Sequence, residues 1–211
     1  METYRVGVIA DTHVPEFLPA LPEGIAGLFQ GVDLILHAGD ITDQDVLDEL
    51  KALAPVVAVK GDHDKLELPA KTVVEVGGKH IGLIHGRRPR WQELPGIISN
   101  EVLAGRRFWW GGFHRQVLRA FEHVDAIVFG HFHRPYIGYH DNVLLFNPGA
   151  VYHLTPERAQ AELSRPQPLL RRAYLLNARR RLPGTSSVGL LIIENGTIKA
   201  EILPISEGES I

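Results

Sequence analysis

Short apolar runs that each end in aspartate or histidine constrain the fold of this chain more than any other feature. The first run, residues 4–10, is rich in β-branched side chains and is typical of a buried strand. Five such runs lead into polar segments: Asp11-Thr12-His13, Gly39-Asp40, Gly61-Asp62-His63-Asp64, His85-Gly86 and Gly130-His131-Phe132-His133. Ligands collect at the carboxyl ends of strands in α/β proteins, so the pattern predicts an α/β fold with a site there.

The segments around these runs complete an alternation of strands and helices. Residues 44–53 carry apolar side chains at helical spacing, which predicts a helix with Thr42 or Asp43 as its N-cap. Two β-hairpins are expected, turning at Gly77-Gly78 and at Asn195-Gly196. The other expected elements are a short helix at about 23–30 and strands at 33–37, 56–60, 72–76, 79–84, 124–129, 143–146, 188–193 and 197–202.

The bulk composition is that of a globular protein. A chain of 211 residues with 45% hydrophobic and 22% charged side chains fits one compact domain. We expect a single domain over residues 1–211. Two segments lack the alternation of strands and helices, and we expect them to be inserts at about 87–121 and 155–187. A net charge of -3 gives no overall attraction to nucleic acid or to an anionic membrane.

The amino-terminal residues and the hydropathy pattern indicate where the protein works. Residues 1–5 run directly into the first strand, without the basic, apolar and small-residue regions of a signal peptide. No apolar stretch approaches the length that spans a membrane. We therefore expect a cytoplasmic protein with no membrane partner.

The two expected inserts are rich in aromatic and basic residues. The cluster Phe108-Trp109-Trp110 leaves three interpretations open: a lid over the substrate, a contact in a homo-oligomer, or the small core of an extra helix. The arginines of residues 171–181, on an expected helical hairpin, favour a solvated helix face over nucleic-acid binding. Further members of the first insert are Arg87, Arg88, Arg90, Trp91, Arg106, Arg107 and Phe113.

The absence of cysteine restricts the chemistry of any metal site. Disulfides and thiolate ligands are excluded, so a metal must be held by aspartate, histidine, asparagine or backbone oxygen. Asp11 and His13 lie two residues apart at a strand end and are expected to point the same way. Mixed histidine and carboxylate ligands suit Mn²⁺, Fe, Ni²⁺, Co²⁺ or Zn²⁺ better than Mg²⁺ or Ca²⁺.

Taken in order, the five polar segments resemble the DxH, GD, GNH(D/E), H and GHxH motifs of the calcineurin-like metallophosphoesterase superfamily. The later segment Asn147-Pro148-Gly149 makes the chain similar to the YfcE-type phosphodiesterases in particular. The resemblance implies a four-layer αββα sandwich of two mixed β-sheets flanked by helices. It also implies an enzyme that hydrolyses small-molecule phosphodiesters.

The resemblance further implies a centre of two divalent cations about 3.5–4 Å apart, with a bridging hydroxide that attacks phosphorus in line. Mn²⁺ is the expected ion, and Ni²⁺, Fe, Co²⁺ and Zn²⁺ are the alternatives. Carried over by position, the implied ligands are Asp11, His13 and His133 for one ion, Asp62, His85 and His131 for the other, and Asp40 as the bridge.

Four residues next to the implied ligands are candidates for catalysis and substrate binding. His63 matches the position that protonates the leaving oxygen, and Asp64 is expected to orient its imidazole. Arg87 and Arg88 come directly after His85-Gly86, and guanidinium groups suit phosphate.

Asp62 is a departure from the superfamily pattern, which has asparagine at this position. Both side chains offer an oxygen to a metal, so binding is expected to survive the exchange. The extra negative charge is expected to tighten divalent binding and to weaken attraction for an anionic substrate.

Several alternatives stay open at the level of sequence. Within the same superfamily the enzyme could be a phosphomonoesterase or a nuclease, and a non-catalytic scaffold like the related retromer subunit is a candidate of another class. His37 is interpreted as a structural group beside the site, and Asn147 as a brace of the turn at Pro148-Gly149. Structural roles are also expected for His80, His114, His123, His140 and His153.

Overall fold

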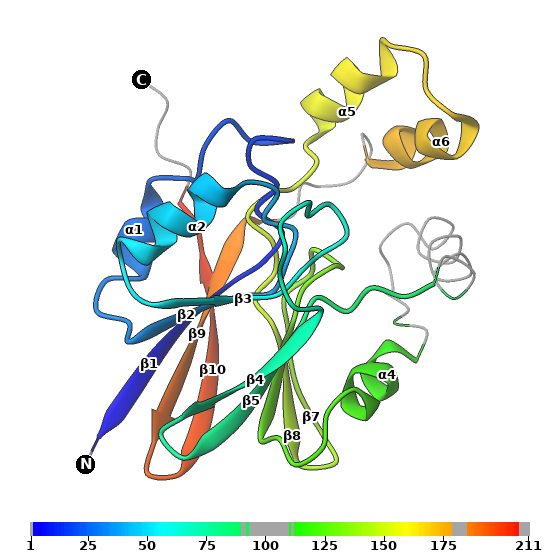
Figure 1. Ribbon diagram of the computed structural model, residues 1–211. Coiled ribbons are helices and arrows are strands. Elements are labelled where there is room, and N and C mark those ends of the chain that lie inside the picture. Colours follow the sequence, from blue (N-terminus) through cyan, green and yellow to red (C-terminus); the bar gives the residue numbers. More distant parts are fainter. Residues whose placement is uncertain (1, 90–91, 93–109, 111, 179–184, 207–211) are drawn as a thin grey trace. The chain divides into compact units, whose positions relative to one another are not determined.

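The computed structural model describes residues 2–89, 92, 110, 112–178 and 185–206 (Figure 1). They divide into two compact units. The first unit comprises residues 1–87, 114–152 and 186–211, and the second comprises residues 88–113 and 153–185. The second unit overlaps the two expected inserts, and a single domain over residues 1–211 stays a prediction.

One five-stranded sheet of the first unit, sheet A, has β1 at its centre. Its order is β10-β9-β1-β2-β3, with β1 parallel to β2 and antiparallel to β9. Its strands are β1 (Thr3–Ile9), β2 (Leu34–His37), β3 (Val56–Ala58), β9 (Ser187–Glu194) and β10 (Thr197–Pro204). Because β1, β2 and β3 are parallel, the polar segments that follow them meet at one edge of the sheet.

The other five-stranded sheet, sheet B, has the order β4-β5-β6-β8-β7. Its strands are β4 (Lys71–Val76), β5 (Lys79–Ile84), β6 (Ala126–Phe129), β7 (Tyr136–His140) and β8 (Val143–Asn147). Strands β5, β6 and β8 are parallel, with antiparallel β4 and β7 at the edges. The sequence pattern does not predict β7, because Pro135 directly precedes this half-buried edge strand and Gly138 lies at its centre.

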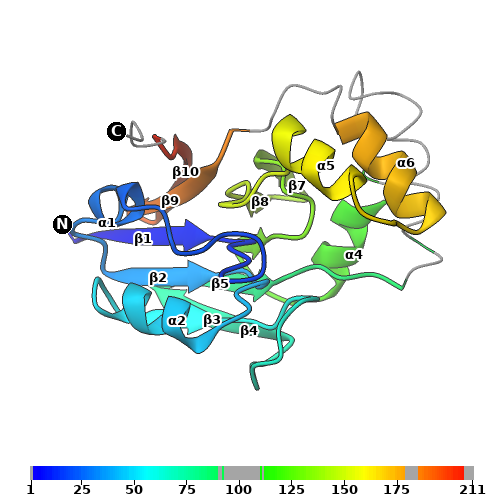
Figure 2. The same cartoon turned by 90° about the horizontal axis from the view of Figure 1, so that it is seen from above.

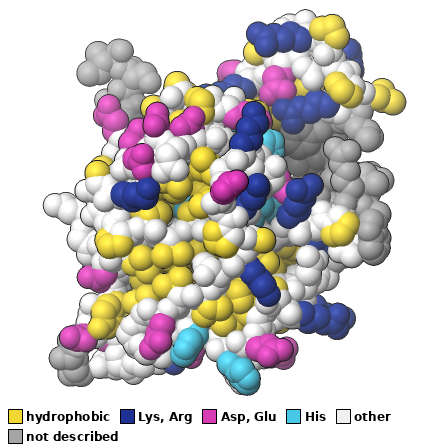
Figure 3. All heavy atoms as spheres, viewed as in Figure 1, with side chains coloured by type: hydrophobic (Ala, Val, Ile, Leu, Met, Phe, Trp, Pro, Cys, Tyr) yellow, Lys and Arg dark blue, Asp and Glu magenta, His cyan; other side chains and the backbone are white. Residues whose placement is uncertain are grey.

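The two sheets share one apolar core, and a second core lies on the other face of sheet A. Between the sheets, residues such as Val8 and Leu36 pack with Leu83, Val128 and Phe146. The outer face of sheet A is covered by α1 (Gly24–Leu28) and α2 (Gln44–Lys51), as Figures 1 and 2 show. Hydrophobic side chains are visible at the surface over the strands (Figure 3), in keeping with the partly buried residues of the inter-sheet core.

The remaining helices complete the sandwich and the second unit. On sheet B, α4 (Phe113–Arg119) leads into Phe121, whose ring lies over Gly82 of β5. Two mixed sheets flanked by helices are the α/β sandwich that the sequence predicts. Asp43 is the N-cap of α2 and accepts from the backbone N–H of Asp45, as expected.

The second unit contains the expected helical hairpin, formed by α5 (Pro156–Leu163) and α6 (Leu169–Ala178). Arg171 of α6 pairs with Glu162 of α5 at 2.7 Å. Most of the aromatic and basic residues singled out above lie outside the described residues, namely Arg90, Trp91, Arg106, Arg107, Phe108, Trp109 and Arg179 to Arg181. The lid, oligomer and nucleic-acid interpretations therefore stay predictions.

Among the described residues, every helix is too short or too polar to cross a lipid bilayer.

Candidate metal centre

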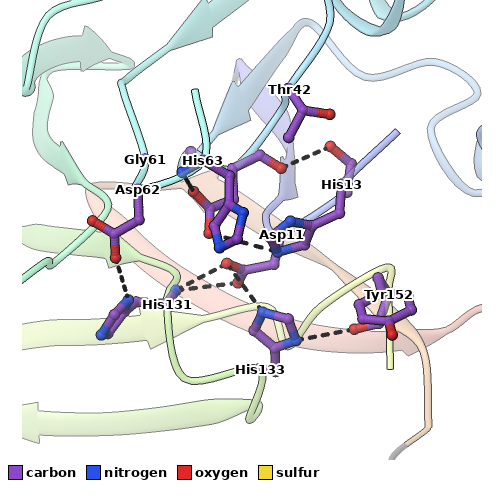
Figure 4. Close-up of polar contacts among 12 residues, drawn as sticks. Asp11, His13, Thr42, Gly61, Asp62, His63, His131, His133 and Tyr152 are labelled. Carbon is purple, nitrogen blue, oxygen red and sulfur yellow. Dashed lines mark hydrogen bonds and ion pairs between the residues drawn. The ribbon is translucent and has the colours of Figure 1, made fainter. Parts of the chain in front are cut away.

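The seven predicted ligands all lie just beyond strand ends in the first unit. Asp11 and His13 follow β1, Asp40 follows β2 and Asp62 follows β3 in sheet A. His85 follows β5, and His131 and His133 follow β6 in sheet B. The parallel strands of both sheets thus deliver histidine and carboxylate side chains to one place (Figure 4).

The backbone at these positions is unusual. Five of the seven ligand candidates have positive φ: Asp11 (53°), His13 (51°), Asp40 (57°), His131 (75°) and His133 (51°). Such conformations cost on the order of 1–3 kcal/mol each in non-glycine residues and cluster at functional sites. The expected reason for the convergence of Asp11 and His13, alternation along a strand, is thus wrong: both residues lie past the end of β1 in left-handed conformations.

The first predicted triad, Asp11, His13 and His133, has ligand atoms within 4.8 Å of one another. His133 Nδ1 donates to the carbonyl oxygen of Tyr152 at 3.1 Å, so its Nε2 carries the lone pair and lies 3.6 Å from Asp11 Oδ1. The Asp11 carboxylate also accepts from the backbone N–H of His131 at 3.1 and 3.2 Å. Figure 4 shows Asp11 between the two histidines of sheet B.

The second predicted triad, Asp62, His85 and His131, is equally compact. Asp62 Oδ2 lies 3.2 Å from His131 Nδ1 and 3.9 Å from His85 Nε2. His85 Nδ1 donates to the carbonyl oxygen of Ala38 at 2.8 Å, which leaves the Nε2 lone pair facing the triad.

Asp40 lies between the two triads. Its Oδ2 is 3.5 Å from His13 Nε2 and 3.4 Å from His85 Nε2. Its Oδ1 accepts from the backbone N–H of His63 at 2.8 Å. One carboxylate oxygen therefore faces a ligand nitrogen from each triad, as a bridging ligand must.

The donor set fits divalent cations. The Nε2 atoms of His13 and His85 are buried and have no hydrogen-bond partner, although buried polar atoms almost always have one. A cation in each triad would satisfy these atoms, and nitrogen and carboxylate donors without sulfur suit Mn²⁺, Fe, Ni²⁺, Co²⁺ or Zn²⁺.

The pKa shifts of the ligand candidates also indicate a site suited to cations. Burial raises the pKa of Asp11 to about 7 and lowers that of His13. Burial also acts to raise the pKa of Asp40, but its contacts with His85 and His63 hold that pKa well below the usual range. For His85, burial acts to lower the pKa, and the contact with Asp40 outweighs it, so the pKa is raised. Carboxylates and imidazoles that share one buried space interact strongly, and cations would replace the protons they share.

Asp64 does not have the role expected of it. Its buried carboxylate accepts four backbone N–H groups, from Asp40 (3.0 Å), Ile41, Thr42 and Gly61 (2.7 Å each). These bonds hold the loop after β2 against the loop after β3, and they use both carboxylate oxygens. The expectation that Asp64 orients the His63 imidazole is therefore corrected: Asp64 braces the backbone of the bridge Asp40.

Glu16 takes the place expected for Asp64. Its Oε2 lies 2.8 Å from His63 Nδ1 and 3.6 Å from His13 Nδ1. The side chain of His63 is 41% exposed, so the ring is open to solvent beside the two triads. Sequence reasoning missed Glu16, although its place three residues after His13 was the available signal.

Gly61, which precedes Asp62, lies where the loop after β3 approaches the loop after β2 closely. A Cβ atom at Gly61 would lie 2.2 Å from the backbone nitrogen and from Oδ1 of Asp40. Only glycine lets the loop after β3 approach the bridging carboxylate this closely.

His37 and Asn147 have the structural roles predicted for them. The buried His37 accepts from the backbone N–H of Gly39 and lies 3.3 Å from Thr12 Oγ1, and burial lowers its pKa to about 3. Asn147 accepts from the N–H of Gly149 and donates to the carbonyl oxygen of Gly130, both at 2.9 Å. Asn147 therefore braces its own turn and the segment that carries His131.

The two predicted phosphate-binding arginines differ sharply. Arg87 belongs to the first unit, is 73% exposed and lies with Nε 2.9 Å from Asp62 Oδ1. Arg88 belongs to the second unit, where it is buried with its guanidinium over the Phe113 ring. A contact of either arginine with phosphate stays a prediction.

Comparisons with known proteins agree with this geometry. The family model described as a calcineurin-like phosphoesterase superfamily domain matches residues 4–163. A probable metallophosphoesterase of Methanocaldococcus jannaschii is 38% identical over 150 residues, which cover 70% of this chain and 68% of that protein. A phosphodiesterase of the same archaeon is 26% identical over 152 residues, covering 69% and 82% of the two chains.

A solved structure shares the fold over nearly the whole chain. Vacuolar protein sorting 29 from Cryptosporidium parvum superposes with a TM-score of 0.60 at 20% identity. The likeness covers 97% of this chain and 98% of that one.

Proposed function

The chain belongs to the calcineurin-like phosphoesterase superfamily, and from this premise we propose that it hydrolyses phosphodiester bonds with two divalent cations. It is a hydrolase of that superfamily and a metal-dependent phosphoesterase. The observation that carries the two-cation proposal is the position of Asp40 Oδ2, 3.5 Å from His13 Nε2 and 3.4 Å from His85 Nε2. The relative named a phosphodiesterase supports the choice of substrate class.

The proposed ligands form two sets, one for each cation, and both sets include the carboxylate of Asp40. Asp11, His13 and His133 would hold one cation, and the second set comprises Asp62, His85 and His131, with Asp40 common to both. When bound, the two cations lower the pKa of a water and offset charge on the phosphoryl oxygens. We propose Mn²⁺ as the ion, with Ni²⁺, Fe, Co²⁺ and Zn²⁺ as alternatives of similar ligand preference.

His63 is the group that we propose for protonating the leaving oxygen. Its backbone N–H donates to Asp40 Oδ1, so the backbone of His63 is held against the bridging carboxylate. Glu16 Oε2 lies 2.8 Å from Nδ1 and accepts a hydrogen bond from that nitrogen, so Nε2 is the ring nitrogen left to donate a proton to the leaving oxygen.

The substrate that we propose is a small-molecule phosphodiester. A net charge of -3 provides no general attraction for nucleic acid, so a nuclease is the less favoured alternative. A phosphomonoesterase would use the same two triads. Only a measurement of substrate preference distinguishes it from the proposed phosphodiesterase.

A second candidate function is a non-catalytic scaffold, and the fold likeness to vacuolar protein sorting 29 favours it. Against it, all seven predicted ligands and His63 converge with their nitrogen and oxygen atoms in the first unit. A scaffold does not need five strained, positive-φ ligand positions.

The test is a comparison of a diester with a monoester. With Mn²⁺ added to chelator-treated protein, we expect hydrolysis of bis-p-nitrophenyl phosphate at least about tenfold faster than that of p-nitrophenyl phosphate, a difference of ~1.4 kcal/mol in barrier. Chelator alone should remove the activity. A preference for the monoester would replace the diesterase by a phosphomonoesterase, and protein that binds no Mn²⁺ or Ni²⁺ and is inactive with both would support the scaffold.

A further inference from the structure

The two oxygens of the Asp62 carboxylate face different partners. Oδ2 faces the second triad, 3.2 Å from His131 Nδ1. Oδ1 is buried and has no hydrogen-bond partner, and Arg87 Nε lies 2.9 Å from it as an ion pair. Asp62 therefore lies between the expected position of a cation and a fixed positive charge.

The ion pair joins the two sheets at their carboxyl ends. Asp62 follows β3 of sheet A, and Arg87 follows His85 at the end of β5 of sheet B. The side chain of Asp62 is 23% exposed and that of Arg87 is 73% exposed. The guanidinium thus lies at the rim of the site, where water and salt reach it.

The two triads have the same donor types but different surroundings. Each combines one aspartate with two histidines. Asp11 of the first triad is fully buried and accepts from a backbone N–H, whereas Asp62 of the second triad is paired with an arginine. A positive charge held beside one triad lowers the affinity of that triad for a divalent cation.

We propose that Arg87 is a positioning residue that offsets the charge of Asp62, so that the second triad binds its cation more weakly than the first. This inference rests on the proposed two-cation function. Together, Asp62 and Arg87 would have a net charge close to zero. That is the charge of the asparagine that the superfamily pattern has at this position. The added charge of Asp62 would then neither overtighten the second site nor repel an anionic substrate.

The experiment measures Mn²⁺ binding to each triad separately by isothermal titration calorimetry at low salt. A His133→Ala background leaves the second triad whole, and a His85→Ala background leaves the first. In the His133→Ala background, Arg87→Gln is expected to tighten Mn²⁺ binding about tenfold, because the substitution removes a positive charge that repels a divalent cation held by Asp62. Arg87→Lys, which keeps the charge, should stay within about twofold of the background protein.

Two comparisons separate this effect from a general change of surface charge. In the His85→Ala background, Arg87→Gln should tighten Mn²⁺ binding clearly less than in the His133→Ala background, because among the described residues Arg87 contacts Asp62 of the second triad and no member of the first. Combined with Asp62→Asn, Arg87→Gln should also have little effect, because the carboxylate that holds the guanidinium is gone. High salt should shrink the tenfold difference.

Unchanged or weaker Mn²⁺ binding by Arg87→Gln in the His133→Ala background would overturn the inference. So would a tenfold effect that persists with Asp62→Asn, since Arg87 would then act without its partner. Failure of the proposed function has a different signature: the protein without these substitutions would bind fewer than two Mn²⁺ ions per chain.

Discussion

Asp40→Ala is expected to lower hydrolysis of bis-p-nitrophenyl phosphate by about a thousandfold, ~4 kcal/mol of transition-state stabilisation. Asp40 Oδ2 faces His13 Nε2 and His85 Nε2, one nitrogen from each triad. Without this carboxylate the two cations would lose the one ligand that the proposal has them share, so less negative charge would offset their mutual repulsion. Metal analysis of the variant should find no more than one Mn²⁺ per chain.

Two variants keep this result interpretable. Asp40→Asn retains an oxygen for the N–H of His63 but removes the charge, so a loss shared with Asp40→Ala is attributable to the charge. Asp48→Ala removes an aspartate that is 59% exposed on α2 and should leave the rate unchanged. Two bound ions and near-normal turnover in Asp40→Ala would contradict the bridging role.

The second large effect is expected for His63→Gln, and it should depend on the leaving group. General acid catalysis contributes about 10²–10⁴-fold when the leaving group is a poor one. A diester with an alkyl leaving group should therefore lose about a hundredfold or more in turnover, whereas one with p-nitrophenolate, which departs without a proton, should lose little. Glu16→Gln should produce the same pattern at smaller amplitude, because Glu16 holds His63 Nδ1 at 2.8 Å.

The leaving-group series separates chemistry from folding. A variant that is merely misfolded loses activity toward all substrates equally. As a control, His80→Gln, at an exposed histidine on β5, should leave turnover unchanged with both the alkyl and the p-nitrophenyl substrates. An equal loss with alkyl and p-nitrophenyl substrates in His63→Gln would remove His63 as the acid. If the loss depends on the leaving group in His63→Gln but not in Glu16→Gln, His63 remains the acid and only the supporting role of Glu16 is contradicted.

The sequence was sufficient for the framework because each strand carries its own signal. The apolar β-branched runs locate β1, β2, β5 and β6, and the glycine pair at Gly77 locates the turn between β4 and β5. Parallel order then brings the polar segments to the same edge of each sheet. Strand β7 escaped this reasoning because an edge strand with Gly138 at its centre has little apolar periodicity.

The details of the site depend on contacts between distant segments, which local patterns do not encode. Asp64 is adjacent to His63 in sequence, but its carboxylate instead accepts N–H groups from residues 40–42. The partner of His63 is Glu16, 47 residues earlier in the chain. The left-handed backbone at Asp11 and His13 likewise results from loop packing, since neither residue type requires positive φ.

The most direct measurement is anomalous diffraction at the manganese absorption edge from crystals of the protein grown with Mn²⁺. The account predicts two anomalous peaks about 3.5–4 Å apart, the spacing of two-metal hydrolases. One peak should lie within bonding distance of Asp11, His13 and His133, the other of Asp62, His85 and His131, and Asp40 should contact both. A single peak, or two peaks that do not share Asp40, would contradict the two-cation centre.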